Sequence, residues 1–120
     1  MNIENVIEIF RRLSGIDAKS TVQLRFFCEN AFEYINSHIR NGANIDGYGS
    51  RLEFAAAAAA YYRYILWSLT DGGSDNIKVG EISISGSGTK QLEAAEKLCN
   101  SALNDIGSIF ENENFFFERA

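Results

Sequence analysis

Apolar residues recur along this chain at the spacing of amphipathic helices, in four separate stretches. In the first stretch, 3–13, an apolar side chain falls at every third or fourth position, as expected for one face of a helix with 3.6 residues per turn. Asn2 precedes it as a helix-capping residue, and Gly15 follows it as a stop signal. The pattern therefore predicts a first helix over 3–13.

A second apolar stripe of the same period runs over 21–40. Ser20 and Gln23 have the spacing of a capping box, in which two side chains satisfy free backbone N–H groups at a helix start. The pair Asn41-Gly42 marks its end. His38, the only histidine, lies near this end, and no orienting group or nucleophile is apparent beside it, so we interpret it as a structural residue.

The third stretch, 51–69, begins with the capping-box pair Ser50 and Glu53 and continues into six alanines, 55–60. Its second half is bulky and aromatic, with Tyr61, Tyr62, Tyr64 and Trp67. Few basic residues accompany these rings, so we interpret them as core residues and not as a stacking platform for bases. The apolar run 54–69 is shorter than the ~20 residues that a membrane span needs, and it contains Arg63, so a packed helix is predicted.

A short extended element is predicted before the last helix. Residues 77–85 alternate between apolar and polar on both sides of Gly80, which is typical of short strands. Such an element is marginal alone and needs a partner. The following Gly-Ser-Gly-Thr-Lys, 86–90, lacks phosphate-loop spacing and is interpreted as a joint that caps a helix over about 89–110. Gly107 is a candidate for an earlier end of this helix. The predicted fold is therefore all-α, with about four helices and a short extended or β-hairpin insertion between the last two.

The predicted organisation is a single helical domain over 1–110 followed by a C-terminal tail, 111–120. The tail holds Phe115, Phe116 and Phe117 between acidic residues. Three consecutive phenylalanines cannot all face one core, and each costs roughly 1.5–3 kcal/mol if it stays in water. Two interpretations stay open at this point: the tail folds over its own helices, or it docks into a partner protein.

Composition and charge exclude several kinds of binding site and catalytic site. The 120-residue chain has a net charge of −5, which argues against binding nucleic acid through its phosphates. Cys28 and Cys99 fall inside apolar helical patterns and are interpreted as buried free thiols of a reducing compartment. The N-terminus does not resemble a signal peptide. Glu93 and Glu96 are interpreted as solvated side chains, and we expect no catalytic site, metal site or cofactor.

The order of these elements resembles the head–tail connector proteins of tailed bacteriophages, also called head-completion or adaptor proteins. Those proteins are small and mostly helical, with an alanine-rich, aromatic penultimate helix. A stretch of the form hydrophobic-x-V-G-[DE]-hydrophobic-S-hydrophobic-S follows, and here it reads IKVGEISIS over 77–85. The resemblance covers about 3–110. Connector chains often carry prolines between their early helices, whereas this chain has none, which affects the expected loops more than the family.

The resemblance implies a structural virion protein of a tailed phage or prophage, made in the bacterial cytoplasm and placed at the virion neck. Twelve copies would form a ring under the portal protein, extend the DNA channel, help to retain packaged DNA and dock a tail-side neck protein. DNA would pass through without sequence-specific binding, and no membrane, cofactor or catalysis is implied. The expected contacts between subunits are Val79, Glu81, Ile82 and Ile84. The expected contacts with the portal are Phe115, Phe116 and Phe117.

The alternative is a small helical adaptor or regulatory protein that binds another protein and has no virion context. The same apolar tail supports it. The two hypotheses differ in stoichiometry, because the alternative predicts a monomer or small oligomer where the first predicts a closed ring.

Overall fold

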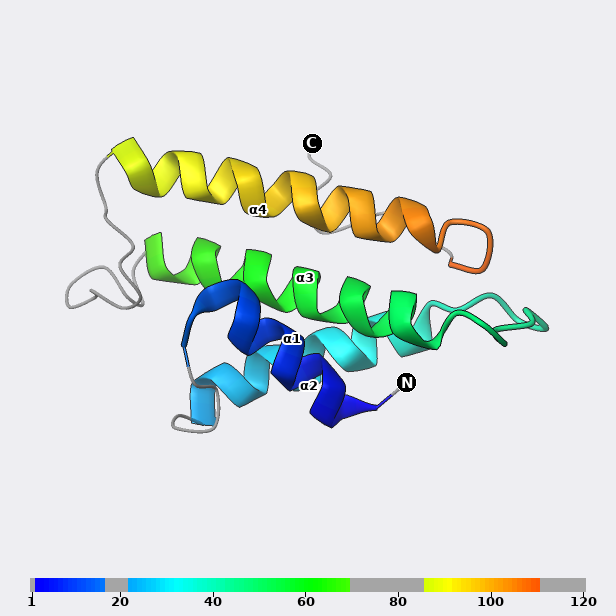
Figure 1. Ribbon diagram of the computed structural model, residues 1–120. Coiled ribbons are helices and arrows are strands. Elements are labelled where there is room, and N and C mark those ends of the chain that lie inside the picture. The colour runs from blue at the N-terminus through cyan, green and yellow to red at the C-terminus, as the bar shows by residue number, and fades with distance from the viewer. Residues whose placement is uncertain (1, 17–21, 70–85, 111–120) are drawn as a thin grey trace.

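The computed structural model describes residues 2–16, 22–69 and 86–110. These residues form four helices: α1 (Ile3–Ser14), α2 (Val22–Ser37), α3 (Gly49–Leu69) and α4 (Gly86–Asp105). Each helix runs in the opposite direction to the one before it (Figure 1). The prediction of a mostly helical chain with four helices is therefore confirmed.

Helix α1 begins and ends as its sequence predicts. The side chain of Asn2 accepts a hydrogen bond from the backbone N–H of Glu4 at 2.8 Å. At the other end Gly15 adopts a left-handed conformation, with φ of 76°, and its N–H donates to the carbonyl of Arg11. Glycine reaches this conformation without the steric cost that a side chain brings. The apolar face between these two ends is buried.

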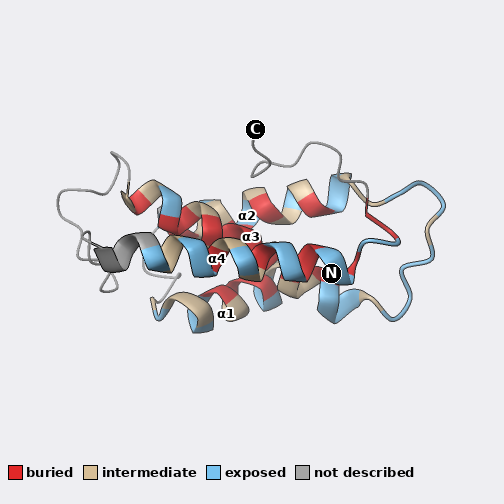
Figure 2. Ribbon diagram, turned by 90° about the horizontal axis from the view of Figure 1, so that it is seen from above, coloured by how far each residue is buried: buried red, intermediate tan, exposed pale blue. Residues whose placement is uncertain are grey.

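Helix α3 lies at the centre and contacts α1, α2 and α4. All six alanines over 55–60 are at most 1% exposed, although they point to every side of the helix. Figure 2 shows this central helix largely in the colour of buried residues. An alanine side chain is a single methyl group, so neighbouring helices can approach the α3 backbone closely from several directions. The six alanines therefore allow close packing of the helices around α3.

The predicted capping box at the start of α3 is wrong. The helix begins at Gly49, so Ser50 lies inside it, and the carbonyl of Tyr48 accepts the first helical bond, from the N–H of Leu52. The carboxylate of Glu53 instead accepts hydrogen bonds from the backbone N–H of Asn2 at 2.8 Å and from the Asn5 amide. Glu53 therefore binds α1 in a tertiary contact and does not cap its own helix in the way that the local pattern predicted.

Helix α2 ends three residues before the predicted 40, and α4 ends at Asp105, close to the candidate stop Gly107. Beyond these two ends, Ile39 and Phe110 form an isolated antiparallel bridge, and the N–H of Arg40 donates to the carbonyl of Ile109 at 2.7 Å. These backbone groups are satisfied between the two chain segments and no longer extend a helix. The bridge fastens the end of α2 to the end of α4.

The start of α4 also differs from the prediction. Residues 86–90 were interpreted as a joint, but they form the first turn of α4, which begins at Gly86. The predicted extended element, 77–85, and the predicted tail, 111–120, lie outside the described residues, as does Ser20 of the other capping-box pattern. Within the described residues, none of the helices has the length and apolar character that crossing a membrane requires.

Candidate functional site

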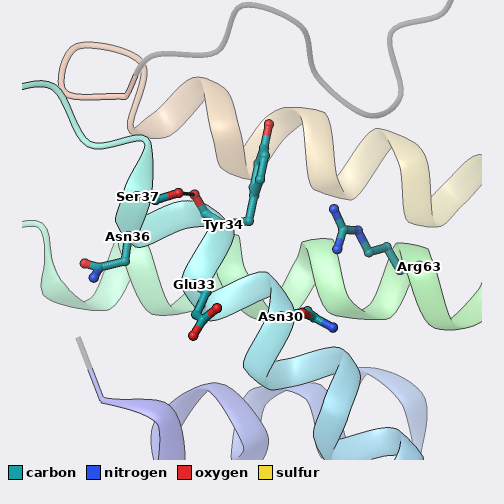
Figure 3. Close-up of a pocket in the computed structure, with 6 residues that line it drawn as sticks. All are labelled: Asn30, Glu33, Tyr34, Asn36, Ser37 and Arg63. Carbon is teal, nitrogen blue, oxygen red and sulfur yellow. Dashed lines mark hydrogen bonds between the residues drawn. The ribbon is translucent and has the colours of Figure 1, made fainter.

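An open hollow of about 550 Å³ lies on the outer face of α2 and against α3. Its lining is polar: Asn30, Glu33, Tyr34, Asn36 and Ser37 from α2, and Arg63 from α3. Figure 3 shows Tyr34 and Arg63 reaching to the same side, toward α4, whereas Glu33 points the opposite way. The hydroxyl of Ser37 donates to the carbonyl of Tyr34 at 3.1 Å, within the same helix.

The strongest electrostatic feature of the hollow is a cation over an aromatic ring. The guanidinium carbon of Arg63 lies 5.7 Å from the centre of the Tyr34 ring. Guanidinium groups are attracted to the negative face of such rings, and partial burial strengthens the attraction. Burial lowers the pKa of Arg63, and the nearby Tyr34 and Cys99 partly offset this effect. Burial raises the pKa of Tyr34 to about 12, so its phenol is neutral and can donate a hydrogen bond at neutral pH.

Tyr34 also belongs to an aromatic group at the junction of α2 and α4. Its ring lies 4.4 Å from the ring of His38 and 6.2 Å from the ring of Phe110, measured between centroids. His38 Nδ1 lies 2.9 Å from the carbonyl oxygen of Tyr34, one turn earlier. These contacts agree with the interpretation of His38 as a structural residue.

The cysteines and tyrosines that the sequence singled out lie mostly in the core. Cys28 and Cys99 are free and fully buried, and burial raises the pKa of both thiols to about 12. Tyr62 and Tyr64 are buried as predicted, while Tyr61 and Trp67 are half-buried against the core. In the described part of the chain, no three His, Cys, Asp or Glu side chains are grouped closely enough to hold a metal ion.

A second surface is apolar and was missed by the sequence analysis. Val22 and Phe26 lie one turn apart on α2 and are 85% and 57% exposed. The Phe26 ring contacts that of Phe27, which in turn packs against Trp67 with centroids 5.8 Å apart. A signal was present, because Val22 and Phe26 are large apolar residues that fall outside the apolar stripe of their helix. We call these two residues the α2 apolar patch.

The residues expected to contact other proteins belong to the segments 77–85 and 115–117. Both sets lie outside the described residues: the expected subunit contacts Val79, Glu81, Ile82 and Ile84, and the expected portal contacts Phe115, Phe116 and Phe117. Sequence reasoning also missed the hollow, since it treated Arg63 only as a charge within an apolar run and gave Tyr34 no role beyond its place in the apolar stripe of α2. No protein-family model, curated protein or solved structure matches this chain.

Proposed function

We propose that this protein is a structural connector of a tailed phage or prophage, which assembles as a ring under the portal and has no catalytic role. The observation that carries the proposal is the order of its elements. An alanine-rich helix with an aromatic second half, α3, precedes the IKVGEISIS stretch at 77–85, and a last long helix, α4, follows. This order is the one that the resemblance to head–tail connector proteins implies.

Two features of the molecule support an assembling role. The α2 apolar patch leaves large side chains in water, and exposed apolar groups of this kind often mark protein contacts. The net charge of −5 suits a channel wall past which DNA slides, because like charges prevent it from adhering. Neither feature is specific to connectors, so the proposal depends on the element order.

In this proposal two segments make the contacts with other molecules. Residues 77–85 add an extended or hairpin element to a neighbouring copy, with Val79, Glu81, Ile82 and Ile84 at the contact, because strand addition satisfies backbone groups between chains. Phe115, Phe116 and Phe117 anchor on the portal, since aromatic side chains are common anchors of interfaces. The opposite end of the ring receives a tail-side neck protein.

Ring formation is tested by placing charges on the apolar positions of 77–85. Ile82→Asp together with Ile84→Asp should abolish rings, as seen by electron microscopy and by mass in solution after mixing with the portal protein. Ser83→Asp with Ser85→Asp is the matched control, because it adds the same charge on the alternate face and should leave rings intact. Normal rings from the isoleucine variant would show that this segment does not join subunits.

Portal binding is tested by deleting 114–120. The shortened chain should keep its helical circular dichroism but lose binding to the portal. Unchanged binding would remove the phenylalanines from the portal contact.

The alternative function, a helical adaptor for another protein, is supported by the same α2 apolar patch, because a contact through this patch needs no ring. A tagged pull-down from the induced host, with mass spectrometry of the recovered proteins, separates the two. Recovery of a portal-like protein with other particle proteins supports the connector. Recovery of a different cellular protein in a one-to-one or two-to-two complex supports the adaptor and rejects the ring.

A further inference from the structure

The connection between α2 and α3 contains an asparagine followed by a glycine, Asn41-Gly42, and no other asparagine of the sequence precedes a glycine. Both residues are exposed, and in Figure 1 this connection extends beyond the helices that it joins. A Cβ added at Gly42 would meet no heavy atom within 4 Å, so the space around it is open. The peptide bond between the two residues is therefore accessible to water.

The backbone around this pair forms a tight turn. The N–H of Ala43 donates to the carbonyl of Arg40 at 3.1 Å, and Gly42, the third residue of the turn, has a φ of 77°. The turn is closed by the N–H of Ala43 and not by that of Gly42. Within the part of the chain that the structure describes, neither the Gly42 N–H nor the Asn41 side chain makes a hydrogen bond. The Gly42 nitrogen is thus neither hydrogen-bonded nor covered.

An asparagine with an accessible nitrogen after it can react within the chain. The backbone nitrogen of Gly42 attacks Cγ of Asn41 and forms a bond to it, while the bond from Cγ to Nδ2 breaks. The proton of the Gly42 N–H leaves with Nδ2 as ammonia, and a five-membered succinimide remains. Water then opens this ring at either carbonyl and gives aspartate or isoaspartate. Because both reacting groups belong to one short segment, their effective concentration is high.

Two other described asparagines lack this combination. The side-chain oxygen of Asn44 accepts a hydrogen bond from the Asp46 N–H at 3.0 Å, and the next residue is the β-branched Ile45, which hinders its own nitrogen. Asn36 lies within α2, where backbone N–H groups donate to helical carbonyls. Both provide internal controls for Asn41 in the same region of the chain.

We propose that Asn41 is a site of spontaneous deamidation, where the Gly42 nitrogen displaces the side-chain amide and water completes the conversion to aspartate and isoaspartate. The product carries one more negative charge, and the isoaspartate form has one more backbone carbon in the turn. The N–H of the preceding Arg40 donates to the carbonyl of Ile109 at 2.7 Å, so the change arises next to the bridge that fastens α2 to α4. The inference does not depend on the connector function.

The test follows conversion in the full-length protein during incubation at mildly alkaline pH. Digestion after glutamate, at acid pH so that it adds no conversion, gives one peptide, 34–53, that holds Asn36, Asn41 and Asn44. Mass spectrometry with fragmentation then locates each new carboxyl group. We expect Asn41 to convert at least about tenfold faster than Asn44, which corresponds to a barrier lower by about 1.4 kcal/mol. Equal rates, or no conversion at Asn41, would overturn the proposal.

Access to the Gly42 nitrogen in the folded protein is tested by comparing native and denatured rates. The exposed turn predicts that Asn41 converts in the native protein within about tenfold of its rate in guanidinium, since opening one surface hydrogen bond costs little. Asn36 should be slowed far more by folding, because its helix must open first. A larger suppression at Asn41 would show that the fold protects this pair, and the proposal would be rejected.

Two variants identify the attacking and the leaving group. Gly42→Ala adds a methyl group beside the nitrogen and should slow conversion at least about tenfold. Because alanine at this φ strains the turn, Asn41→Gln is the second variant: its longer side chain must form a six-membered ring, and the product should be lost. Gly49→Ala is the matched control at the first residue of α3 and should leave the rate at Asn41 unchanged. An unchanged rate in Gly42→Ala would exclude attack by the Gly42 nitrogen.

Discussion

The two halves of α3 are covered by the neighbouring helices in opposite ways. In the first half, six alanines are all buried, and the neighbouring helices come close enough to cover every side. In the second half, large side chains fill the space: the Tyr64 ring makes edge contacts with Phe10 of α1 and Phe27 of α2. That half also leaves Leu66 40% exposed. The first half should therefore tolerate no added volume, and the second half no lost volume.

The largest effect is expected from removing volume in the aromatic half. Ile65 is 1% exposed, and Ile65→Ala should lower the free energy of unfolding by about 2–5 kcal/mol, because the cavity it leaves cannot fully collapse. Urea unfolding of the variant measures the loss. Leu66→Ala is the matched control on the exposed side of the same turn and should change stability by about 0.5 kcal/mol or less. Equal losses from both would mean that the two sides of this half are packed alike.

Adding volume to the alanine half should cost somewhat less. Ala58 is fully buried, and Ala58→Leu forces neighbouring helices apart, which should destabilise the protein by about 1–3 kcal/mol. Ala94→Leu on the exposed face of α4 adds the same side chain to a helix without crowding and should be nearly neutral. A stable Ala58→Leu variant would show that the helices around the alanines have room to move.

A smaller effect, of the opposite sign, is expected at Tyr64. Its hydroxyl is buried and has no hydrogen-bond partner among the described residues, and an unsatisfied group of this kind costs about 1–3 kcal/mol. Tyr64→Phe should therefore leave stability unchanged or raise it by up to about 1 kcal/mol in thermal or urea unfolding. The control Tyr48→Phe removes a hydroxyl that lies 3.0 Å from Ser108 Oγ and should instead cost up to about 1 kcal/mol. A clear loss in Tyr64→Phe would indicate that its hydroxyl has a partner in solution.

The last prediction concerns the two thiols, which lie on α2 and α4, on either side of α3. Burial raises the pKa of Cys28 and of Cys99 from the ordinary 9.0 to about 12. The folded state therefore favours the protonated thiols: this stabilisation is complete below about pH 9 and is lost as the pH rises toward 12. At pH 8 a disulfide reagent should label both slowly in the native protein and rapidly in guanidinium. Fast native labelling of one thiol alone would mean that its side of α3 opens independently.

The comparison also explains which features could be predicted. The start and end of α1 depend on neighbouring residues only, so Asn2 and Gly15 were enough to locate them. The end of α2 is followed by a bridge between Ile39 and Phe110, which are 71 positions apart in the chain, and a periodic pattern contains no information about such a pairing. The same holds for Glu53, whose partners Asn2 and Asn5 belong to another helix.

The candidate sites also differ in whether they depend on local sequence or on contacts between distant residues. The predicted contact residues over 77–85 and 115–117 come from a motif and from local composition, and they remain predictions. The hollow depends on the packing of α2 against α3, because Tyr34 and Arg63 come from different helices and lie together only in the folded protein. The α2 apolar patch falls between these cases: its residues are visible in the sequence, but their exposure is decided by which face of α2 the neighbouring helices cover.

The sequence by itself determined the four helices, the start and end of α1 and the burial of both cysteines, because apolar periodicity and capping residues act over neighbouring positions. Only the tertiary structure decided where α2 ends, which residues Glu53 contacts and that the Arg63 guanidinium lies over the Tyr34 ring. These features arise from contacts between side chains and backbone groups that are far apart in the chain. Their energies depend on distances that a linear pattern does not encode.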